Sequence, residues 1–404
     1  MLSVAGARNV LLLQGPNSPF YSRLARALER RGARVLRVIF APGDALFWRG
    51  RSVAFRGRPE GFRPWLAQLI RREGITDLVC LGDGRERHRE GLAVARAAGV
   101  ATHVLEQGYL RPGWLTLDPG GTGGASAFQP KLAAAGHGEP HPGSEGAGFV
   151  AWAAMDVAAT AATLAAPLLG YPHYRRHALV HPLAEWAGWA LKAALWPLRR
   201  WRRRRGLAWF SRRTGPLFLL PLQLETDFQI RNHGRGKTMR GHLRRTVLSF
   251  ARQASPECRL AVKVHPLDPF PWRWAGEVSR LARRLRVSER LLFLDGGELG
   301  ALLGHCSGVV TVNSTVGLTA LRAGLPVAVL GDAVWARPDL VARPPLAAFW
   351  HAPRAPGPKG VETLMGALTA TIQVPGAFDG RGACLGAEGV ADRIACRHTR
   401  RAAA

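Results

Sequence analysis

The amino-acid sequence predicts an α/β protein made of two Rossmann-like units, each a parallel sheet covered by helices. Short apolar runs alternate with segments in which apolar residues recur at helical spacing, and this alternation occurs once before and once after a stretch of different composition. Strands that alternate with helices form parallel sheets, because a crossover helix returns the chain to the start of the next strand. With 404 residues, 47% of them hydrophobic and 21% charged, the chain is long enough for two globular domains.

The first unit is predicted over residues 1–145. Its first helix shows the pattern clearly, since Phe20, Leu24 and Leu28 fall on one face and Gly32 marks the end. Residues 118–147 are rich in Gly, Pro and small residues and are expected to be a loop. The predicted strands are Asn9–Gln14, Arg34–Phe40, Asp77–Leu81 and Ala101–Leu105, and the predicted helices are Phe20–Arg31, Pro64–Glu73 and Arg85–Ala98.

Residues 146–214 are predicted to form a helical linker. Phe149–Leu169 is mostly apolar, but Asp156 and the many alanines favour a packed helix over a membrane span. Trp186–Trp201 is rich in Trp and Leu and precedes a run of arginines, which is typical of a helix lying in the interface of an anionic membrane. A surface helix packed on its own domain, with solvated arginines, is the alternative. The predicted membrane-facing residues are Trp196, Trp201, Arg202, Arg203, Arg204 and Arg205.

The second unit is predicted over residues 215–370, followed by a C-terminal tail, 371–404, whose last residues are expected to fray. Two such units joined by a linker leave a cleft, and ligands of open α/β sheets bind at the carboxyl ends of the strands. The predicted strands are Pro216–Leu222, Arg259–His265, Leu291–Leu294, Val309–Val312 and Pro326–Leu330, and the predicted helices are Gly241–Ala254, Gly276–Leu285, Glu298–Cys306 and Leu318–Ala323.

The net charge indicates what kind of partner the protein binds, and the cysteines indicate its cellular compartment. With 56 Lys and Arg against 28 Asp and Glu, the net charge of +28 predicts an anionic partner: nucleic acid, anionic lipid or a phosphorylated substrate. The five cysteines are scattered and form no CxxC pair, so a zinc site or disulfide framework is not indicated and a reducing, cytoplasmic setting is expected. The N-terminal residues lack the pattern of a secretory signal.

Polar residues follow two strands of the second unit. Asn313, Ser314 and Thr315 lie where a strand passes into a helix, and a helix N-terminus with hydroxyl groups favours a bound anion, although a local N-cap is the alternative. His265-Pro266 ends another strand, because proline cannot continue the ladder. A histidine there can donate a hydrogen bond to a phosphate or pass a proton to a leaving group, or it can be a satisfied, partly buried residue. Since both loops belong to one predicted sheet, we expect them to converge on one ligand.

In the first unit, Glu106 follows a buried strand and is the first candidate for a nucleophile or base. An ion pair with Arg111 is the alternative. Four other strand-end residues are expected on the same side. They are Gly15 and Asn17 after the first strand, Asp83 in the Gly82–Arg85 turn, and Tyr109 after Gly108. The first loop lacks GxGxxG, so a dinucleotide is not indicated.

Seven segments together resemble the capsular polysaccharide synthesis proteins of the KpsS/LipB type. These are β-Kdo transferases that begin the poly-Kdo linker of bacterial capsules on a phosphatidylglycerol-type lipid. The His-Pro pair and the later Ser/Thr segment also resemble those of transferases that use CMP-sialic acid. The matching segments are LLLQGPNSPFYSRLARAL (11–28), FAPGDALFW (40–48), LGDGRERHREGLAVARAAGV (81–100), LEQGYLRPGWLTLD (105–118), PLQLETDFQI (221–230), VKVHPLD (262–268) and VTVNSTVGLTALRAGLPV (310–327).

The resemblance implies a GT-B fold and a retaining transferase. The C-terminal domain would bind CMP-Kdo without a metal or other cofactor. The N-terminal domain would take the acceptor, with Glu106 as nucleophile and Asp118 in reserve. Gln107 stands where related enzymes have a second acid, and Phe228 stands where a serine is common. The implied donor-side residues are Gln223, Asp227, Gln229, His265, Pro266, Asn313, Ser314 and Thr315.

The resemblance also implies a peripheral location at the cytoplasmic face of the inner membrane, an anionic phospholipid acceptor and other capsule synthesis and export proteins as partners. A transferase that uses another nucleotide sugar is the second hypothesis. A basic nucleic-acid-binding protein is the third, but only Trp186–Arg205 interleaves aromatic and basic residues as that function requires. The strand-end loops would then have no role, so no nucleic-acid partner is expected.

Overall fold

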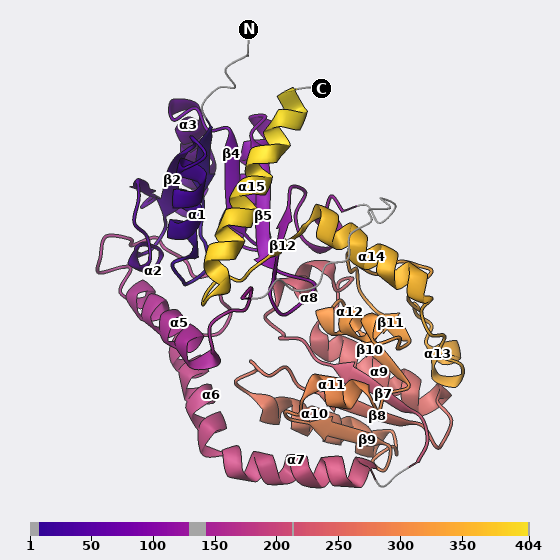
Figure 1. Ribbon diagram of the computed structural model, residues 1–404. Helices are drawn as coiled ribbons and strands as arrows, with labels where there is room; N and C mark the ends of the chain where they lie inside the picture. Colours follow the sequence, from indigo (N-terminus) through magenta and orange to yellow (C-terminus); the bar gives the residue numbers. More distant parts are fainter. Residues whose placement is uncertain (1–7, 129–142, 212–213, 403–404) are drawn as a thin grey trace. The chain divides into compact units, whose positions relative to one another are not determined.

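The computed structural model describes residues 8–128, 143–211 and 214–402, which fall into two compact units (Figure 1). Unit 1 combines Met1–His177 with Met365–Ala404, and unit 2 is the continuous stretch Ala178–Leu364. Each unit is a largely or wholly parallel sheet covered by helices. The predicted class, two Rossmann-like α/β units as in GT-B proteins, is therefore confirmed.

Unit 1 contains, within its described residues, a seven-stranded sheet of order β12-β6-β5-β4-β1-β2-β3. Strands β1 to β5 run parallel, β6 runs antiparallel to β5, and β12 runs antiparallel to β6. The carboxyl ends of the neighbours β5, β4 and β1 therefore lie at one edge. The strands are β1 (Asn9–Leu12), β2 (Arg34–Ile39), β3 (Ser52–Ala54), β4 (Asp77–Leu81), β5 (Ala101–Gln107), β6 (Trp114–Asp118) and β12 (Gln373–Pro375).

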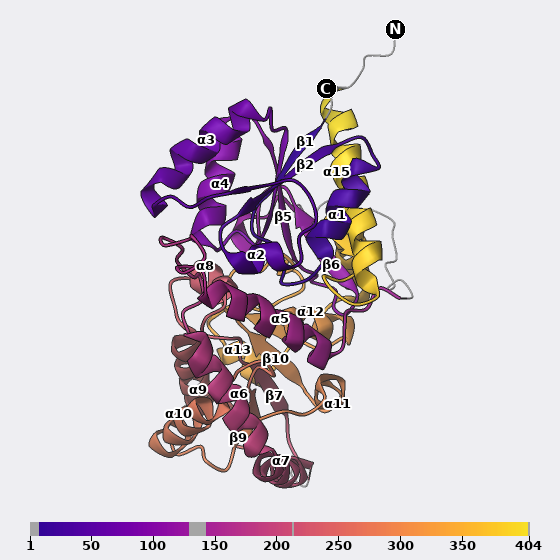
Figure 2. The same cartoon turned by 90° about the vertical axis from the view of Figure 1, so that its left-hand side faces the viewer.

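Helices cover both faces of this sheet, because alternate strand residues enter two separate hydrophobic clusters. Val10 and Leu12 pack with α1 and α15, whereas Leu11 and Leu13 pack with α3 and α4. Figure 2 shows the two helix pairs on opposite sides of the strands. The helices of unit 1 are α1 (Phe20–Glu29), α2 (Pro42–Leu46), α3 (Phe62–Arg72), α4 (Glu86–Ala97), α5 (Phe149–Leu164) and α15 (Gly382–Ala402), with 3-10 turns η1 (Pro59–Gly61) and η2 (Gly123–Ala125).

The C-terminal segment 371–404, expected to be a tail, instead contributes β12 and α15 to unit 1. Val374 of β12 pairs with Leu115 of β6, and α15 buries Val390 and Ile394 in the cluster it shares with α1. The sequence pattern is weak here, because β12 spans only three residues and α15 is rich in Ala and Gly.

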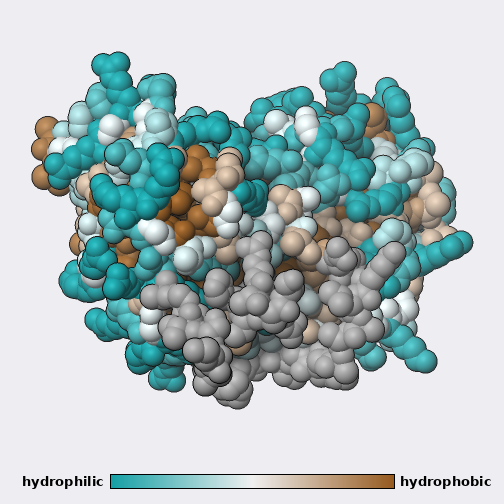
Figure 3. Space-filling view, turned by 90° about the horizontal axis from the view of Figure 1, so that it is seen from above, coloured by the Kyte–Doolittle hydropathy of each residue, from teal (hydrophilic) through white to brown (hydrophobic). Residues whose placement is uncertain are grey.

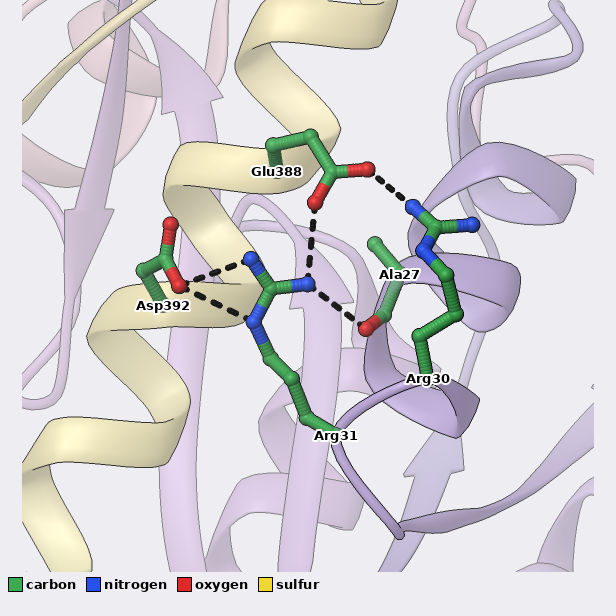
Figure 4. A network of polar contacts seen from close by, with 5 residues as sticks. All are labelled: Ala27, Arg30, Arg31, Glu388 and Asp392. Carbon is green, nitrogen blue, oxygen red and sulfur yellow. Dashed lines mark hydrogen bonds and ion pairs between the residues drawn. The ribbon is translucent and has the colours of Figure 1, made fainter.

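Ion pairs line the contact between α1 and α15 (Figure 4). Arg31 donates to Asp392 Oδ1 through Nε and Nη2 at 2.9 and 2.7 Å, and both Arg30 and Arg31 pair with Glu388. Exposed ion pairs contribute at most about 1 kcal/mol each. The buried apolar residues therefore hold α15 in place, and the ion pairs set its register on α1.

Helix α5, predicted from the apolar run at 149–169, packs against α2 within unit 1. A Cβ on Gly43 of α2 would overlap Thr163 Oγ1, so only glycine permits this approach. Much of α5 is exposed, with Phe149 at 54% and Val150 at 81%. None of the helices in the described ranges is long and apolar enough to cross a membrane.

Unit 2 has, in its described part, a five-stranded parallel sheet of order β11-β10-β7-β8-β9. Its strands are β7 (Leu217–Pro221), β8 (Arg259–Lys263), β9 (Leu291–Leu294), β10 (Gly308–Thr311) and β11 (Val327–Val329). Its helices are α6 (Pro182–Ala194), α7 (Trp196–Ser211), α8 (Phe228–His233), α9 (Met239–Gln253), α10 (Pro271–Arg284), α11 (Leu299–Leu303), α12 (Thr315–Arg322) and α13 (Ala347–His351), while α14 (Pro358–Thr371) contains the second unit boundary.

The predicted linker, 146–214, is divided between the units, with α5 in unit 1 and α6 and α7 in unit 2. The expected single helix over Trp186–Trp201 is interrupted at Leu195, because Pro197, in the first turn of α7, has no N–H to donate to the Ala193 carbonyl. Helix α7 lies against the end of β9, where a Cβ on Gly296 would be 2.7 Å from Arg203 Nη1.

The surface reflects the basic composition. Figure 3 shows hydrophilic side chains over most of the visible face, with only smaller hydrophobic patches between them. Since basic residues outnumber acidic ones by 56 to 28, such a surface attracts anions over its whole area. The specific sites must therefore be found from the arrangement of particular side chains.

Candidate functional site

In unit 2, the polar loops predicted from the sequence follow β10, β7 and β8, which are neighbours in the sheet. The three strands run parallel, so their carboxyl ends meet at one edge. Asn313 follows β10, Gln223 follows β7 and His265 follows β8. The structure thus brings the predicted donor-side residues of unit 2 to the same edge.

A hydrogen-bonded amide network joins two of these loops. Gln223 Nε2 donates to Asn313 Oδ1 at 2.9 Å, and the Asn313 amide N–H donates back to Gln223 Oε1 at 3.3 Å. Asn313 Nδ2 also donates to the Gln229 carbonyl at 2.9 Å, so it ties the start of α8 to the same point. Gln223 and Asn313 are both buried. Their contacts fix the spacing between the β7 and β10 loops.

Two predicted residues cap helices. Ser314 Oγ accepts from Val316 N at 3.2 Å, which bears out the N-cap alternative for α12. Its hydroxyl hydrogen remains a donor, and Thr315 adds a second hydroxyl in the first turn. Asp227 likewise caps α8, accepting from Gln229 N at 2.9 Å. Both helix N-termini are thereby defined at the edge where the strands end.

His265 begins a tight turn. Asp268 N donates to the His265 carbonyl at 3.0 Å with Pro266 at the second position, and Leu267 N donates to His265 Nδ1 at 3.1 Å. Because Nδ1 accepts this hydrogen bond, the neutral imidazole carries its proton on Nε2. His265 is therefore presented as a hydrogen-bond donor through Nε2.

Lys192, which no sequence pattern indicated, reaches this turn from α6. Its Nζ donates to the carbonyls of Pro266 and Asp268 at 2.6 and 2.8 Å, and its side chain is buried. A single lysine in an apolar helix resembles an ordinary surface residue, and the contact joins residues 74 positions apart. Only the tertiary fold reveals the pairing.

In unit 1, Glu106 lies at the end of β5 beside the loop that follows β4. Gly82 has a positive φ of 69°, and a Cβ there would be 3.4 Å from Glu106 Oε2, which places the carboxylate against this turn. The half-buried Glu106 also accepts from its neighbour Gln107 N through Oε1 at 3.2 Å. Burial, and then the nearby Glu106, raise the pKa of the Tyr109 hydroxyl, so Tyr109 stays protonated.

Asp83 and Asp118 brace one loop. Asp83 accepts from Thr122 N at 2.8 Å and Thr122 Oγ1 at 2.6 Å, whereas buried Asp118 accepts the Gly120, Gly121 and Ala127 amides and the Ser126 hydroxyl. A Cβ on Gly121 would lie 2.6 Å from Asp83 Oδ2. The oxygens of Asp118 are occupied by four donors, which makes Glu106 the better candidate for chemistry.

The other predicted acceptor-side residues have local partners. Asn17 donates to Asp156 of α5 at 2.8 Å, Arg111 Nε donates to the Gly108 carbonyl at 3.0 Å, and Gly15 lies against the ring of Tyr21. Arg111 thus braces its own turn. These residues shape the loops around the strand ends.

A second polar network, after β1, was not predicted from the sequence. Gln14 accepts from Arg85 Nη1 at 2.9 Å and donates to Asp44 Oδ1 at 3.0 Å and to the Tyr174 hydroxyl at 3.4 Å. Burial, and then Asp44, raise the pKa of Tyr174. The position of Gln14, directly after an apolar strand, was the one available signal.

His88 of α4 supports the loop after β4 from inside unit 1. Its Nδ1 lies 2.8 Å from the Gly82 carbonyl, and its side chain is fully buried. Burial, with a smaller contribution from Arg85, lowers the pKa of His88 to about 3. The imidazole is therefore neutral under ordinary conditions and donates through Nδ1. Within the described ranges, no three His, Cys, Asp or Glu side chains gather where they could hold a metal ion.

The predicted membrane-facing residues lie on α7. Trp196 and Trp201 are 51% and 52% exposed, and Arg200 and Arg205 stack over their rings. Arg203 is less exposed because it lies against Gly296. An exposed tryptophan carries an apolar surface that water solvates poorly, so α7 presents exposed aromatic and basic side chains together.

The sequence matches the model of the family described as "Capsule polysaccharide biosynthesis protein" over residues 76–378. The chain belongs to this family. The match includes both strand-end regions, from the loop after β4 to that after β10, and so confirms the family resemblance.

Two curated relatives match most of the chain. The "Capsule polysaccharide export protein KpsS" of Escherichia coli is 30% identical over 91% of this chain and 96% of its own length. The "Capsule polysaccharide modification protein LipB" of Neisseria meningitidis serogroup A is 29% identical over 87% of this chain and 86% of its own length. Like them, this chain is a capsule polysaccharide protein.

Solved structures that match this chain include the β-Kdo 2,7 transferase KpsC of Thermosulfurimonas dismutans, which is 15% identical with a TM-score of 0.48 over 96% of this chain and all of that one. Anabaena HepE, solved with UDP and glucose, is 12% identical with a TM-score of 0.34, over 96% of this chain and 95% of that one.

Proposed function

We propose that this protein is a glycosyltransferase that moves Kdo from CMP-Kdo to a phosphatidylglycerol or lysophosphatidylglycerol acceptor, starting the poly-Kdo linker of a capsule. The observation that carries the proposal is the convergence of donor groups from three neighbouring strand ends of unit 2, in a chain of the capsule polysaccharide biosynthesis family. CMP leaves with a negatively charged phosphate, which hydrogen-bond donors held in place by a fold stabilise.

The donor-side roles follow from the hydrogen bonds. His265 would donate through Nε2–H to the phosphate, and the Ser314 and Thr315 hydroxyls would donate beside it at the start of α12. Asn313 and Gln223 would contribute indirectly, by holding the two loops at a fixed distance, because their amides are hydrogen-bonded to each other.

The acceptor-side role centres on Glu106. In a retaining transfer, its carboxylate would attack the anomeric carbon as the bond to CMP breaks, and the acceptor hydroxyl would then displace the carboxylate, passing its proton to the phosphate of the released CMP. Asp83 and Asp118 would keep the neighbouring loop in place.

The protein would act as a peripheral protein on the cytoplasmic face of the inner membrane, where it would meet its lipid acceptor and the other capsule proteins. The exposed Trp196 and Trp201 and the adjacent arginines support this location, because aromatic side chains enter the interface and arginines pair with anionic headgroups.

The test is turnover with defined substrates. Purified protein is incubated with CMP-Kdo and lysophosphatidylglycerol in detergent, and CMP release and glycolipid are measured by chromatography and mass spectrometry. Release of CMP with formation of a Kdo-lipid is expected. No release from CMP-Kdo, with turnover of a UDP-sugar, would favour a transferase of another nucleotide sugar. Tight RNA binding at physiological salt without any turnover would instead indicate a nucleic-acid-binding protein.

A further inference from the structure

Lys192 is a buried cation whose ammonium group bonds to the backbone of a single turn. Its side chain, on α6, is 6% exposed, and Nζ donates to the Pro266 carbonyl at 2.6 Å and the Asp268 carbonyl at 2.8 Å. The centroid of the Trp189 ring lies 4.3 Å from Nζ. Removing an ammonium group from water costs several kcal/mol unless such partners compensate it. Two carbonyls and an aromatic ring supply that compensation here.

The two carbonyls belong to the turn that presents His265. This turn is closed by Asp268 N donating to the His265 carbonyl, and it places Leu267 N 3.1 Å from His265 Nδ1. The Asp268 carboxylate holds the far side, accepting from Phe270 N and Trp274 Nε1, both at 2.7 Å. Lys192 therefore fixes the backbone of the turn on one side, and Asp268 anchors it on α10.

We propose that Lys192 is a positioning residue for His265. Its ammonium group donates hydrogen bonds to the Pro266 and Asp268 carbonyls and so fixes the conformation of the turn. In this conformation the Leu267 N–H donates to His265 Nδ1, which keeps the proton of the neutral imidazole on Nε2. The Nε2–H donor then has the direction needed for the phosphate of a CMP-sugar. This last step rests on the proposed function, whereas the state of the imidazole does not.

The helix that carries Lys192 is itself anchored. Arg199 of α7 pairs with Asp295 through two hydrogen bonds, of 2.5 and 2.6 Å, and donates to the Lys192 carbonyl at 3.1 Å. Asp295 directly follows β9, the neighbour of β8. The Trp- and Arg-rich helices are thus joined to the ends of two strands, and Lys192 carries this connection to His265.

The decisive measurement is the ¹⁵N NMR spectrum of the His265 imidazole at neutral pH. In the wild-type protein we expect a single neutral tautomer protonated on Nε2. Lys192→Met keeps the side-chain length but removes the charge, and a mixture of tautomers is expected. Arg244→Met, which breaks the 2.7 Å pair with Glu277 between α9 and α10, is the matched control and should leave the His265 signals unchanged.

Activity gives the second readout. Lys192→Met should lower kcat with CMP-Kdo by roughly 10²-fold while KM changes little, because misdirecting a donor by about 1 Å affects the transition state more than substrate binding. Lys192→Arg, which keeps the charge, should recover part of the loss. If the wild-type protein shows no transfer at all, the proposed function fails, but the tautomer measurement still decides the role of Lys192.

The pH dependence of the wild-type protein supplies a third test, which is compared with the Lys192 variants. Burial, and then Arg199, lower the pKa of Lys192, while Asp295 and Asp268 oppose the shift. Raising the pH should therefore produce mixed His265 tautomers below the ordinary lysine pKa, but not in Lys192→Arg. Buried Lys263, whose pKa is also lowered, faces Asp295. Mixing that persists in Lys192→Arg would assign the effect to Lys263, and a single tautomer in folded Lys192→Met would overturn the proposal.

Discussion

Among the residues proposed for the site, unit 2 contributes amides, hydroxyls, an imidazole and one carboxylate, Asp227, which caps α8, whereas unit 1 contributes the carboxylates Asp83, Glu106 and Asp118. Neutral donors suit a site that receives a leaving phosphate, because negative charges there would repel it. Carboxylates suit a site that attacks an electron-poor carbon or removes a proton from an acceptor. Within the proposed transfer, the groups of unit 2 would therefore suit the departing phosphate, and the carboxylates of unit 1 would suit bond formation.

The largest expected effect comes from removing the carboxylate charge in unit 1. Glu106→Gln should lower the transfer rate by about 10²–10⁴-fold, since the amide neither attacks carbon nor accepts a proton. Circular dichroism should show an unchanged fold. Glu388→Gln, on the exposed contact between α1 and α15, is the control and should retain full activity. Normal turnover by Glu106→Gln would remove unit 1 from the chemistry.

The matching change in unit 2 is His265→Ala. It should lower transfer by about 10²–10³-fold, because the leaving phosphate loses a fixed donor, with little change in the melting temperature. Turnover and CMP binding by calorimetry both check this. Activity that survives would make His265 a structural residue and would leave the hydroxyls of Ser314 and Thr315 to carry the donor site.

The membrane surface of unit 2 is tested by replacing Arg202–Arg205 with Gln. Each arginine near an anionic surface contributes roughly 1 kcal/mol, so binding to phosphatidylglycerol vesicles should fall by about 10²-fold or more. A charge-matched variant with Arg240, Arg245, Arg252 and Arg283 replaced controls for net charge. Equal losses in both variants would show that only the overall charge matters.

Asn313→Ala should mainly affect stability. It leaves Gln223 buried without its amide partner, which costs about 1–3 kcal/mol, and urea unfolding measures the change. Ser314→Ala, which loses only the cap of α12, should cost about 1 kcal/mol. If Asn313→Ala keeps normal stability but loses CMP binding, the amide network belongs to the ligand site itself.

A pH effect distinguishes the two histidines, since His88 in unit 1 is buried and neutral whereas His265 is only half-buried. The folded pKa of His88, about 3, lies below the unfolded value of about 6.5. The unfolded chain therefore binds the extra proton, and stability should fall between pH 6.5 and 3 by at most ~1.4 kcal/mol per pH unit. His88→Asn, whose Nδ2 replaces the donor to Gly82, should flatten this part of the curve measured by thermal unfolding.

Much of the fold follows from local patterns, while the completion of the sites depends on distant contacts. The apolar runs at β4 and β9 matched the predicted strands at both ends, because buried parallel strands leave a continuous signal. The polar loops after β7, β8 and β10 were predictable for the same reason. Lys192 and Gln14 were not, because their partners are set by how helices and loops pack. Strand β12 was not predictable either, because three residues are too few to show an alternating apolar pattern.

The return of the chain to unit 1 has a consequence for biosynthesis. Unit 2 is one unbroken stretch, so all of its residues are available once Leu364 has left the ribosome. Unit 1 begins first but lacks its edge strand β12 and the helix α15 until residues 373–402 have been added, which leaves Leu115 and the apolar face of α1 uncovered. Unit 1 is thus completed after unit 2, and a chain interrupted before residue 373 has a whole unit 2 and an unfinished unit 1.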